Sequence, residues 1–382
     1  MLTSCWDQNE LNEIAIAVGM GIDKQEDHIQ LTIQIVNPGE VASNKGGGGY
    51  SLPINTYSVS EPTLLEAIRK LTTIAPRHIF MSHLRILVIG EALAREGIAG
   101  VLDGVDRYHQ IRSDFYIIIA RETSAKNVLG ILTTIEKIPA NKMFTMLEMS
   151  EQSWAPTTNI RLDQLVQDIA SPTKDPVLTG IRIVGAQEVG KTLKNLESSD
   201  MAANLEYSGI GLLKQDKLVD WLNEDESKGY NYIMGQVNTT AGHVKCPKEG
   251  IFGVEITRTN STIKGKVVHG KPEILIELFV EENISEIQCK IDLTKPEVIQ
   301  ELEKNAEEEL QKIMKATIHK AKENKSDILG FSNAIEDASP KSWRLLKDNW
   351  EEEFANLKVS IHVDVRIRRP GTINNSVNER ME

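Results

Sequence analysis

Residues 273–280 read Glu273-Ile274-Leu275-Ile276-Glu277-Leu278-Phe279-Val280, with apolar side chains at every second position. This spacing is typical of a strand that has one buried face and one solvated face. Three further stretches, at residues 252–258, 262–268 and 284–291, show a similar alternation. Together the four stretches predict an antiparallel meander.

A long helix is predicted after this meander. Pro296 suits the first turn of a helix, where its missing N–H is not needed. Side chains at helical spacing then form one apolar stripe, made of Val298, Leu302, Ala306, Leu310, Ile313, Thr317 and Ala321. Small residues interrupt the stripe, so we expect the helix to cover its own sheet rather than to form a coiled coil or bind a partner. With a last alternating strand at 357–365, these elements predict an α+β domain over residues 246–374.

The first part of the chain has a different pattern. The runs Arg85-Ile86-Leu87-Val88-Ile89-Gly90 and Phe115-Tyr116-Ile117-Ile118-Ile119-Ala120 are almost wholly apolar, as expected for strands covered on both faces. Amphipathic helices are predicted between and after them. Strand and helix alternating along the chain indicate an α/β layer arrangement, which we place at residues 13–158.

Residues 159–245 are predicted to form a smaller middle domain, with strands at 209–213 and 218–222 joined by a hairpin turn. The predicted fold class is therefore mixed α/β, or α+β, with three domains that are each a sheet with packed helices. The C-terminal domain is the antiparallel meander with one long covering helix. Residues 1–12 are expected to form a tether outside these domains.

Composition limits the classes of partner. The chain has 382 residues, with 43 basic and 55 acidic side chains and a formal net charge of −12. This balance argues against a nucleic-acid partner and against adhesion to anionic lipid by charge alone. No stretch approaches the roughly 18–20 uninterrupted apolar residues that a membrane-spanning helix requires.

The first residues, Leu2-Thr3-Ser4-Cys5, resemble the lipobox at which a bacterial lipoprotein is cleaved and acylated. A lipobox has an aliphatic residue three positions before the cysteine and small residues directly before it. The charged and apolar regions of a signal peptide do not precede this stretch, so we expect that Met1 is not the natural start. The alternative is an ordinary N-terminus with an incidental cysteine at position 5.

The other two cysteines, Cys246 and Cys289, do not make a disulfide framework. They can pair if their strands are neighbours, and the alternative is a buried free thiol at each position. His243 and Cys246 are a conceivable metal pair, but two ligands are not a zinc site.

Other motifs favour structure over chemistry. The glycines at 46–49 lack the lysine and hydroxyl residue of a phosphate loop, and Gly19-Met20-Gly21 precedes an acidic turn instead of a helix. His78 and His83 have no orienting carboxylate near them in sequence. The acidic runs at 307–309 and 351–353 suit solvated faces, and Trp343 with Trp350 suits a core. The sequence therefore predicts no catalytic residue, no metal and no cofactor.

Several motifs, taken in order, resemble the Ger(x)C family, the lipoprotein C subunit of GerA-type nutrient germinant receptors of endospore-forming bacteria. The resemblance runs nearly end to end and rests on these residues: Cys5-Trp6-Asp7, Asn9-Glu10-Leu11, Gly21-Ile22-Asp23, Pro76-Arg77, Ser82-His83, Gly209-Ile210-Gly211, Leu218-Val219-Asp220-Trp221-Leu222-Asn223-Glu224, Asp327-Ile328-Leu329-Gly330-Phe331, Trp343 and Trp350.

The resemblance implies a non-enzymatic protein of three α/β domains, held on the outer face of the spore inner membrane by a diacylglyceryl group on Cys5. The implied partners are a multi-pass A subunit and a transporter-like B subunit. Ser4 departs from the family pattern, because glycine or alanine is common before the cysteine.

The alternative function is a lipid-anchored solute-binding protein, and a cell-wall hydrolase ranks third because no convergent set of titratable groups is visible.

Overall fold

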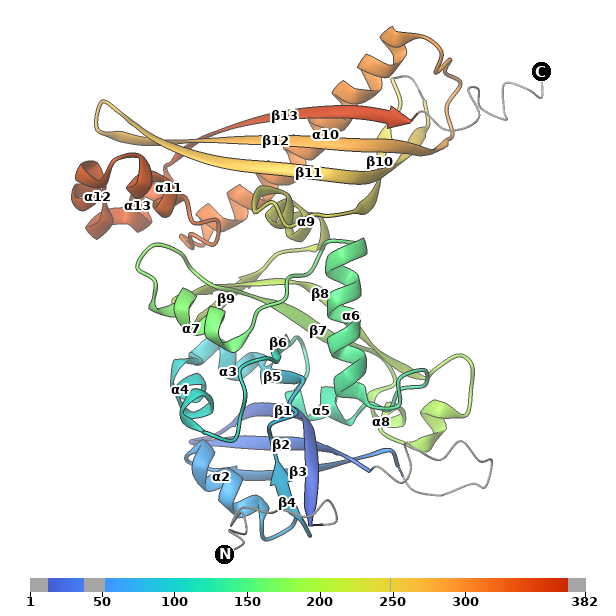
Figure 1. Ribbon diagram of the computed structural model, residues 1–382, viewed down its shortest axis with the longest axis vertical. Coiled ribbons are helices and arrows are strands. Elements are labelled where there is room, and N and C mark those ends of the chain that lie inside the picture. The colour runs from blue at the N-terminus through green and yellow to red at the C-terminus, as the bar shows by residue number, and fades with distance from the viewer. Residues whose placement is uncertain (1–12, 38–51, 248, 370–382) are drawn as a thin grey trace, which may run out of the picture.

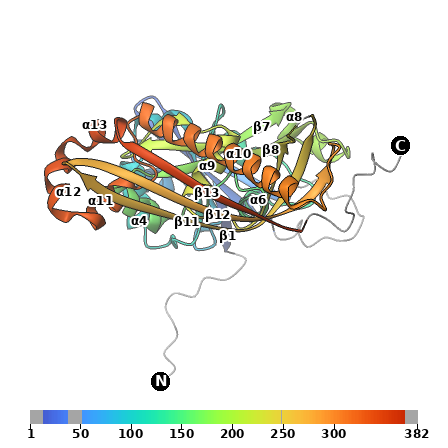
Figure 2. The ribbon, with the colours of Figure 1, turned by 90° about the horizontal axis from the view of Figure 1, so that it is seen from above.

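The computed structural model describes residues 13–37, 52–247 and 249–369 of the chain. Two β-sheets follow one another along the long axis of the molecule (Figure 1). Seen from above, the C-terminal sheet and its long helix lie over the remainder of the protein (Figure 2).

The first sheet has nine strands. They are β1 (Ile14–Gln25), β2 (His28–Val36), β3 (Ile54–Glu61), β4 (His78–Phe80), β5 (Ile86–Gly90), β6 (Tyr116–Ala120), β7 (Val177–Gly185), β8 (Ala203–Lys214) and β9 (Lys217–Trp221). The order is β3-β2-β1-β5-β6-β7-β8-β9, and β4 pairs with the start of β1. The central strands β1, β5, β6 and β7 are mutually parallel, whereas the pairs toward both edges are antiparallel.

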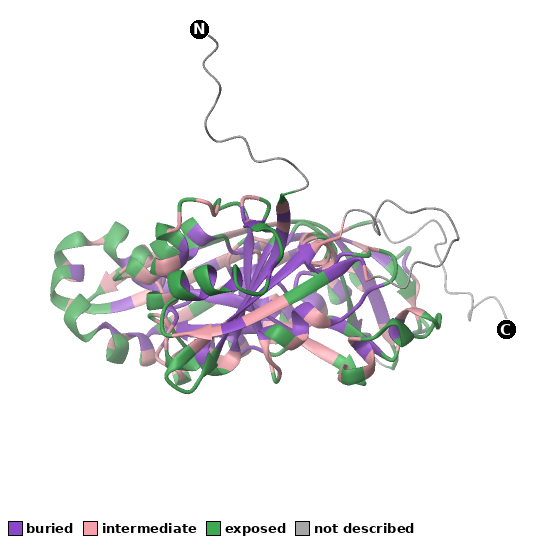
Figure 3. Ribbon diagram, turned by 90° about the horizontal axis from the view of Figure 1, so that it is seen from below, coloured by how far each residue is buried: buried purple, intermediate pink, exposed green. Residues whose placement is uncertain are grey.

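Helices cover both faces of this sheet. They are α2 (Leu64–Leu71), α3 (Glu91–Glu96), α4 (Ala99–Arg107), α5 (Ala125–Gly130), α6 (Pro139–Ser153), α7 (Leu162–Ala170), α8 (Gln187–Gly190) and the 3-10 helix η1 (Leu193–Leu196). Apolar residues of α2, α3, α4 and α7 share one core with the sheet, and those of α5 and α6 share another. Every residue of β5 and β6 is buried, which confirms the prediction of strands covered on both faces. Buried residues gather on the strands inside the molecule (Figure 3).

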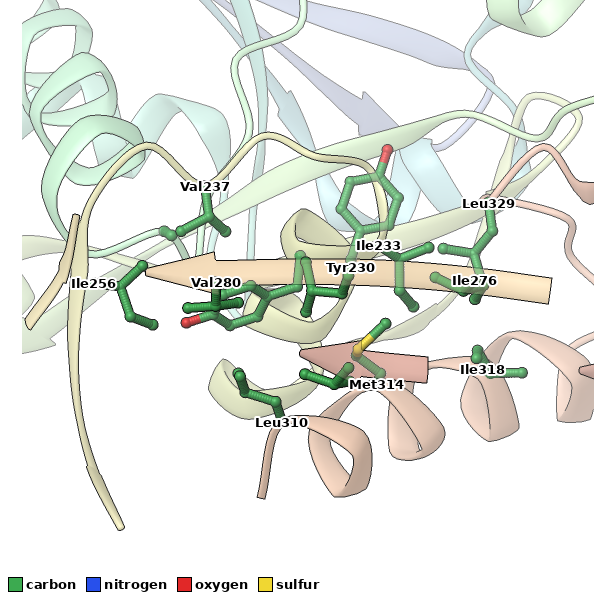
Figure 4. Close-up of a cluster of buried hydrophobic side chains, with 14 of the residues drawn as sticks. Tyr230, Ile233, Val237, Ile256, Ile276, Val280, Leu310, Met314, Ile318 and Leu329 are labelled. Atoms are coloured by element: carbon green, nitrogen blue, oxygen red, sulfur yellow. The ribbon is translucent and has the colours of Figure 1, made fainter. Parts of the chain in front are cut away.

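The second sheet has the order β10-β11-β12-β13. Its strands are β10 (Thr240–Lys245), β11 (Ile251–Val268), β12 (Lys271–Ile287) and β13 (Lys358–Arg369). The helices of this region are α9 (Glu224–Ile233), α10 (Pro296–Glu323), α11 (Phe331–Ala338), α12 (Pro340–Leu346), the 3-10 helix η2 (Lys347–Asn349) and α13 (Trp350–Ala355). Leu310, Met314 and Ile318 of α10 lie in one apolar cluster with Ile276 and Val280 of β12 (Figure 4). The prediction that the long helix covers its own sheet is confirmed.

The predicted meander is wrong in how it divides the residues. Residues 252–258 and 262–268 both belong to β11, which passes through a bulge between Ile256 and Arg258 instead of turning. A bulge absorbs an extra residue that interrupts the alternation. The chain reverses at His269 and Gly270, whose φ values of 50° and 79° suit a two-residue hairpin turn. The sheet is also not wholly antiparallel, because β13 pairs in parallel with β12. The helices α10 to α13 form the crossover connection that a parallel pair of strands requires.

The middle region has no sheet of its own among the described residues. β7 pairs with β6 through Ile118 and Thr179, so β7, β8 and β9 continue the first sheet, whereas β10 joins the second. The β8–β9 hairpin lies at the predicted position. Apolar residues of β7, β8 and α9 share one core with the second sheet. The structure therefore gives two sheets where three were predicted, and the division into three domains stays a prediction.

Cys246 and Cys289 form a disulfide, with Cα atoms 6.4 Å apart. The bond joins the chain just after β10 to the chain just after β12. Because β10 and β12 both pair with β11, the two cysteines come to the same end of the sheet. The pairing that the sequence left open thus follows from the strand register.

One carboxyl group lies in the core of the second sheet. The preceding inward-facing residues of β12 are apolar: Ile274, Ile276, Leu278 and Val280. Glu282 takes the next inward position and is only 1% exposed. Its Oε1 has no hydrogen-bond partner among the described residues. Burial, assisted by the nearby carboxylate of Glu303 on α10, raises the pKa of Glu282 to about 7.

This buried carboxyl predicts a pH-dependent stability. The folded protein binds the proton of Glu282 more tightly than the unfolded chain, so the free energy of unfolding falls as pH rises from the ordinary pKa of 4.5 to about 7. We expect Glu282→Gln, which stays neutral, to be more stable than the wild type at pH 8 by about 2–3 kcal/mol and similar to it at pH 5. Denaturant unfolding at both pH values measures this. Equal stabilities of the two proteins at pH 8 would contradict it, and the exposed Glu255→Gln on β11 is the control.

Candidate functional site

The predicted lipidation site, Cys5, lies outside the described residues. The structure gives the point where the chain from Cys5 enters the folded body. There the N–H of His78 donates to the carbonyl of Glu13 at 3.0 Å, and Ile14 pairs with His78. Residues 6–13 connect Cys5 to this point, and eight residues span at most about 28 Å. The first sheet lies at this end of the molecule and the second sheet at the other (Figure 1).

The groups considered for chemistry do not assemble into a reactive site. Cys246 is bonded to Cys289, so its thiolate is not free to act with His243 as a metal ligand. The ring of His83 packs against Phe80, with centroids 5.7 Å apart. Within residues 13–37, 52–247 and 249–369, no group of three or more His, Cys, Asp or Glu side chains is placed to hold a metal ion. The glycines at 46–49 lie outside those residues.

Asp23 joins the end of β1 to α5. Its carboxylate accepts hydrogen bonds from the N–H groups of Ala125 and Lys126 at 2.8 and 2.9 Å. A Cβ added to Gly90 would come within 2.2 Å of the same carboxylate, so glycine is needed there. Burial raises the pKa of Asp23, and the two N–H donors oppose that shift. The Gly21-Ile22-Asp23 motif therefore serves as a contact between strand and helix.

Trp221 has a similar structural role in β9. Its indole N–H donates to Oε1 of Glu91 at 3.1 Å, and the guanidinium carbon of Arg121 lies 4.9 Å from the ring centroid. A Cβ added to Gly180 would lie 2.6 Å from a ring carbon of Trp221, and a Cβ added to Gly211 would lie 3.1 Å from the same ring carbon. These two glycines provide the flat surface on which the indole packs.

The joint between the two sheets depends on Asp175, in the segment before β7. One carboxylate oxygen of Asp175 accepts from the N–H of Asp327 at 2.9 Å, and the other accepts from the N–H of Gln215 at 2.8 Å. The N–H of Asp175 in turn donates to the carbonyl of Asp327 at 3.1 Å. One residue thus joins the first sheet, the β8–β9 turn and the segment after α10.

Asp327 continues the joint into the C-terminal helices. Its buried carboxylate accepts from the N–H groups of Phe331 and Ser332 at 2.9 and 2.8 Å, and from the indole N–H of Trp350 at 3.0 Å. Burial raises the pKa of Asp327, and these donors oppose the shift. Trp350 makes an edge contact with Trp343, with centroids 5.1 Å apart. Both tryptophans are buried, as predicted.

Ion pairs surround this joint. Lys320 of α10 lies 2.6 Å from Asp220 of β9, and Lys214 lies 2.6 Å from Glu351. A cavity of about 440 Å³ opens beside them. Lys214 in its lining is paired with Glu351, and Asp327 in its lining is bonded as described above. We therefore treat this cavity as part of the joint.

Comparisons with known proteins agree with this architecture. The family described as "Spore germination protein N-terminal domain" matches residues 7–183, and "Spore germination B3/ GerAC like, C-terminal" matches residues 208–371. The second match begins inside β8, so both matched segments contribute to the first sheet.

Spore germination protein KC of Bacillus subtilis (strain 168) is 31% identical over 389 residues, covering 100% of this chain and 96% of that protein. Spore germination protein B3 of the same organism is 23% identical, covering 97% and 95%. The crystal structure of the GerBC protein superposes with a TM-score of 0.56 at 19% identity, covering 92% of this chain and 97% of that one.

The fold is therefore the two-sheet α/β body of a spore germination protein. The chain belongs to the family of GerAC-like and KC-like C subunits. Among its described residues, no helix has the length and apolar character needed to cross a membrane.

The sequence did not reveal Asp175 as part of the joint, because only its position in a proline-rich linker was visible. Its role depends on Gln215 and Asp327, which are distant in sequence. Glu282 had a local signal that could have found it, since it continues the inward-facing series of β12.

The joint predicts a specific loss of stability. In Asp327→Asn, one side-chain oxygen is replaced by an amide NH₂, so at least one of the three N–H donors loses its acceptor while the remaining oxygen can still accept. We expect the free energy of unfolding to fall by about 2–3 kcal/mol. Asp337→Asn, at an exposed position of α11, should change it by less than about 0.5 kcal/mol. Denaturant unfolding tests both variants, and an unchanged Asp327→Asn protein would contradict the assignment.

Proposed function

We propose that this chain is the C subunit of a nutrient germinant receptor, anchored to the outer face of the spore inner membrane by a lipid on Cys5. The observation that carries the proposal is the similarity to spore germination protein KC over nearly the full length of both proteins. This similarity favours the receptor subunit over the alternative of a lipid-anchored solute-binding protein. In this proposal the protein is not an enzyme, and its partners are the membrane-embedded A and B subunits.

The lipid anchor has a physical rationale. Burial of acyl chains contributes about 0.8 kcal/mol per methylene, so a single chain binds a membrane only reversibly and lasting attachment needs two. A diacylglyceryl group on Cys5 supplies both. Because the tether is short, the body stays beside its membrane partners at a high effective concentration, and weak contacts can then hold a complex together.

The disulfide supports a location outside the cytoplasm. Disulfides persist in oxidising environments and are rare in the reducing cytoplasm. Cys246 and Cys289 are 4% to 7% exposed, so the bond is shielded within the second sheet. A body that folds on the outer side of the membrane would retain it.

The anchor is tested by expressing the gene from its own locus in sporulating cells. We expect the wild-type protein to enter the detergent phase on partitioning, whereas Cys5→Ala stays aqueous and the spores lose their response to nutrients. Ser4→Ala, which restores the common residue before the cysteine, should behave as wild type. Normal germination of a Cys5→Ala strain would overturn the proposal.

The state of the cysteines tests the location. We expect that Cys246 and Cys289, in denatured protein taken from spore membranes, do not react with a maleimide before reduction. After reduction, both cysteines should react. The two residues are 43 positions apart, so the double variant to serine should lose about 4 kcal/mol of stability by the loop-entropy relation. Free thiols before reduction would argue for a cytoplasmic protein.

A further inference from the structure

A groove runs between α2 and α4 on the first sheet. Its volume is about 570 Å³, and its lining includes Ile29, Leu64, Ile68 and Val101. Leu65 also lines it and is 54% exposed. We call this feature the α2–α4 groove. Apolar grooves between helices are surfaces into which an amphipathic helix can pack.

The rim of the groove is basic, although the whole chain has a formal net charge of −12. Arg69 and Arg107 line it, with Asp103 as the acidic residue. Asp103 is bound by Arg107 at 2.8 Å, whereas Arg69 has no ion-pair partner among the described residues. Arg69 and Tyr108 both line the groove. Burial raises the pKa of the Tyr108 phenol, and the positive charge of Arg69 opposes this shift. An acidic partner would complement this rim.

The position of the groove fits a partner in the membrane. α2 ends at Leu71 and leads directly into β4, whose His78 bonds to Glu13 at the entry of the tether. Figure 1 shows α2 beside β4 at the lower end of the molecule, with α4 above α2. An anchor on Cys5 would therefore hold this groove within reach of protein segments that project from the membrane.

We propose that the α2–α4 groove binds an amphipathic helix, apolar on one face and acidic at its flanks, from a membrane-embedded subunit of the receptor. This rests on the proposed function. Leu65 and Val101 would contact the apolar face, and Arg69 would pair with an acidic side chain. Because the tether supplies a high local concentration, the groove needs only modest affinity.

Two substitutions test the groove in the complete receptor, co-expressed with affinity-tagged A and B subunits. A Cβ added to Gly100 meets nothing within 4 Å, so Gly100→Leu should fold normally while it narrows the groove. We expect Gly100→Leu and Arg69→Glu each to reduce co-purification with the tagged subunits at least tenfold. Leu345→Asp, at an 85% exposed position on α12, is the matched control and should have no effect. Thermal unfolding of each variant verifies the fold.

A photo-reactive amino acid at position 65 identifies the occupant. Cross-links from this position to the A or B subunit support the proposal. The proposal would be overturned by cross-links only to phospholipid, only to a second copy of this chain, or only from position 345. Unchanged co-purification of both groove variants would also overturn it. If the wild type co-purifies with neither subunit, the proposed function itself fails. If it co-purifies and the groove variants do too, only the groove assignment is lost.

Discussion

The buried carboxylate of Asp327 holds in place the segment to which Asp175 fastens the first sheet. It needs its three N–H donors, two from the start of α11 and one from Trp350, because an uncompensated buried charge costs about 3–5 kcal/mol. Its own backbone is held by Asp175, which also holds the β8–β9 turn. A shift of one sheet against the other would break the hydrogen bonds that the N–H groups of Asp327 and Gln215 donate to the half-buried carboxylate of Asp175. Together with the shared apolar core, this makes the joint stiff.

The carboxyl groups that are buried or, like Asp175, half-buried fall into two kinds. Asp23, Asp175 and Asp327 each accept two or more N–H bonds, so their charge is stabilised at a fixed position and fastens one segment to another. Glu282 has an unpartnered oxygen and the carboxylate of Glu303 nearby, so burial favours its neutral form. The first kind joins elements across long sequence distances. The second makes the stability of the second sheet depend on pH close to neutrality.

Elements with local patterns could be predicted from the sequence. The apolar runs of β5 and β6, the stripe of α10 and the burial of Trp343 and Trp350 follow from spacing alone. Features that depend on long-range pairing could not. The continuation of the first sheet requires Ile118 to pair with Thr179, the disulfide requires the registers of β10 and β12 on β11, and the α2–α4 groove requires two helices some thirty residues apart to lie together. The lipid on Cys5 is a prediction from a local motif, whereas no local pattern indicates the surface that we propose to meet a partner.

The stiffness of the joint bears on how such a body could act at a membrane. A short tether from a lipid on Cys5, as proposed, would limit the distance of the first sheet from the bilayer but would leave its orientation free. A second contact near the tether, such as the α2–α4 groove, would fix the orientation as well. Because the joint is held by buried charges, the second sheet would then have a defined position at the far end of the molecule (Figure 1). Two modest attachments at one end would thus orient the entire protein, whereas a flexible joint would require a third attachment on the second sheet.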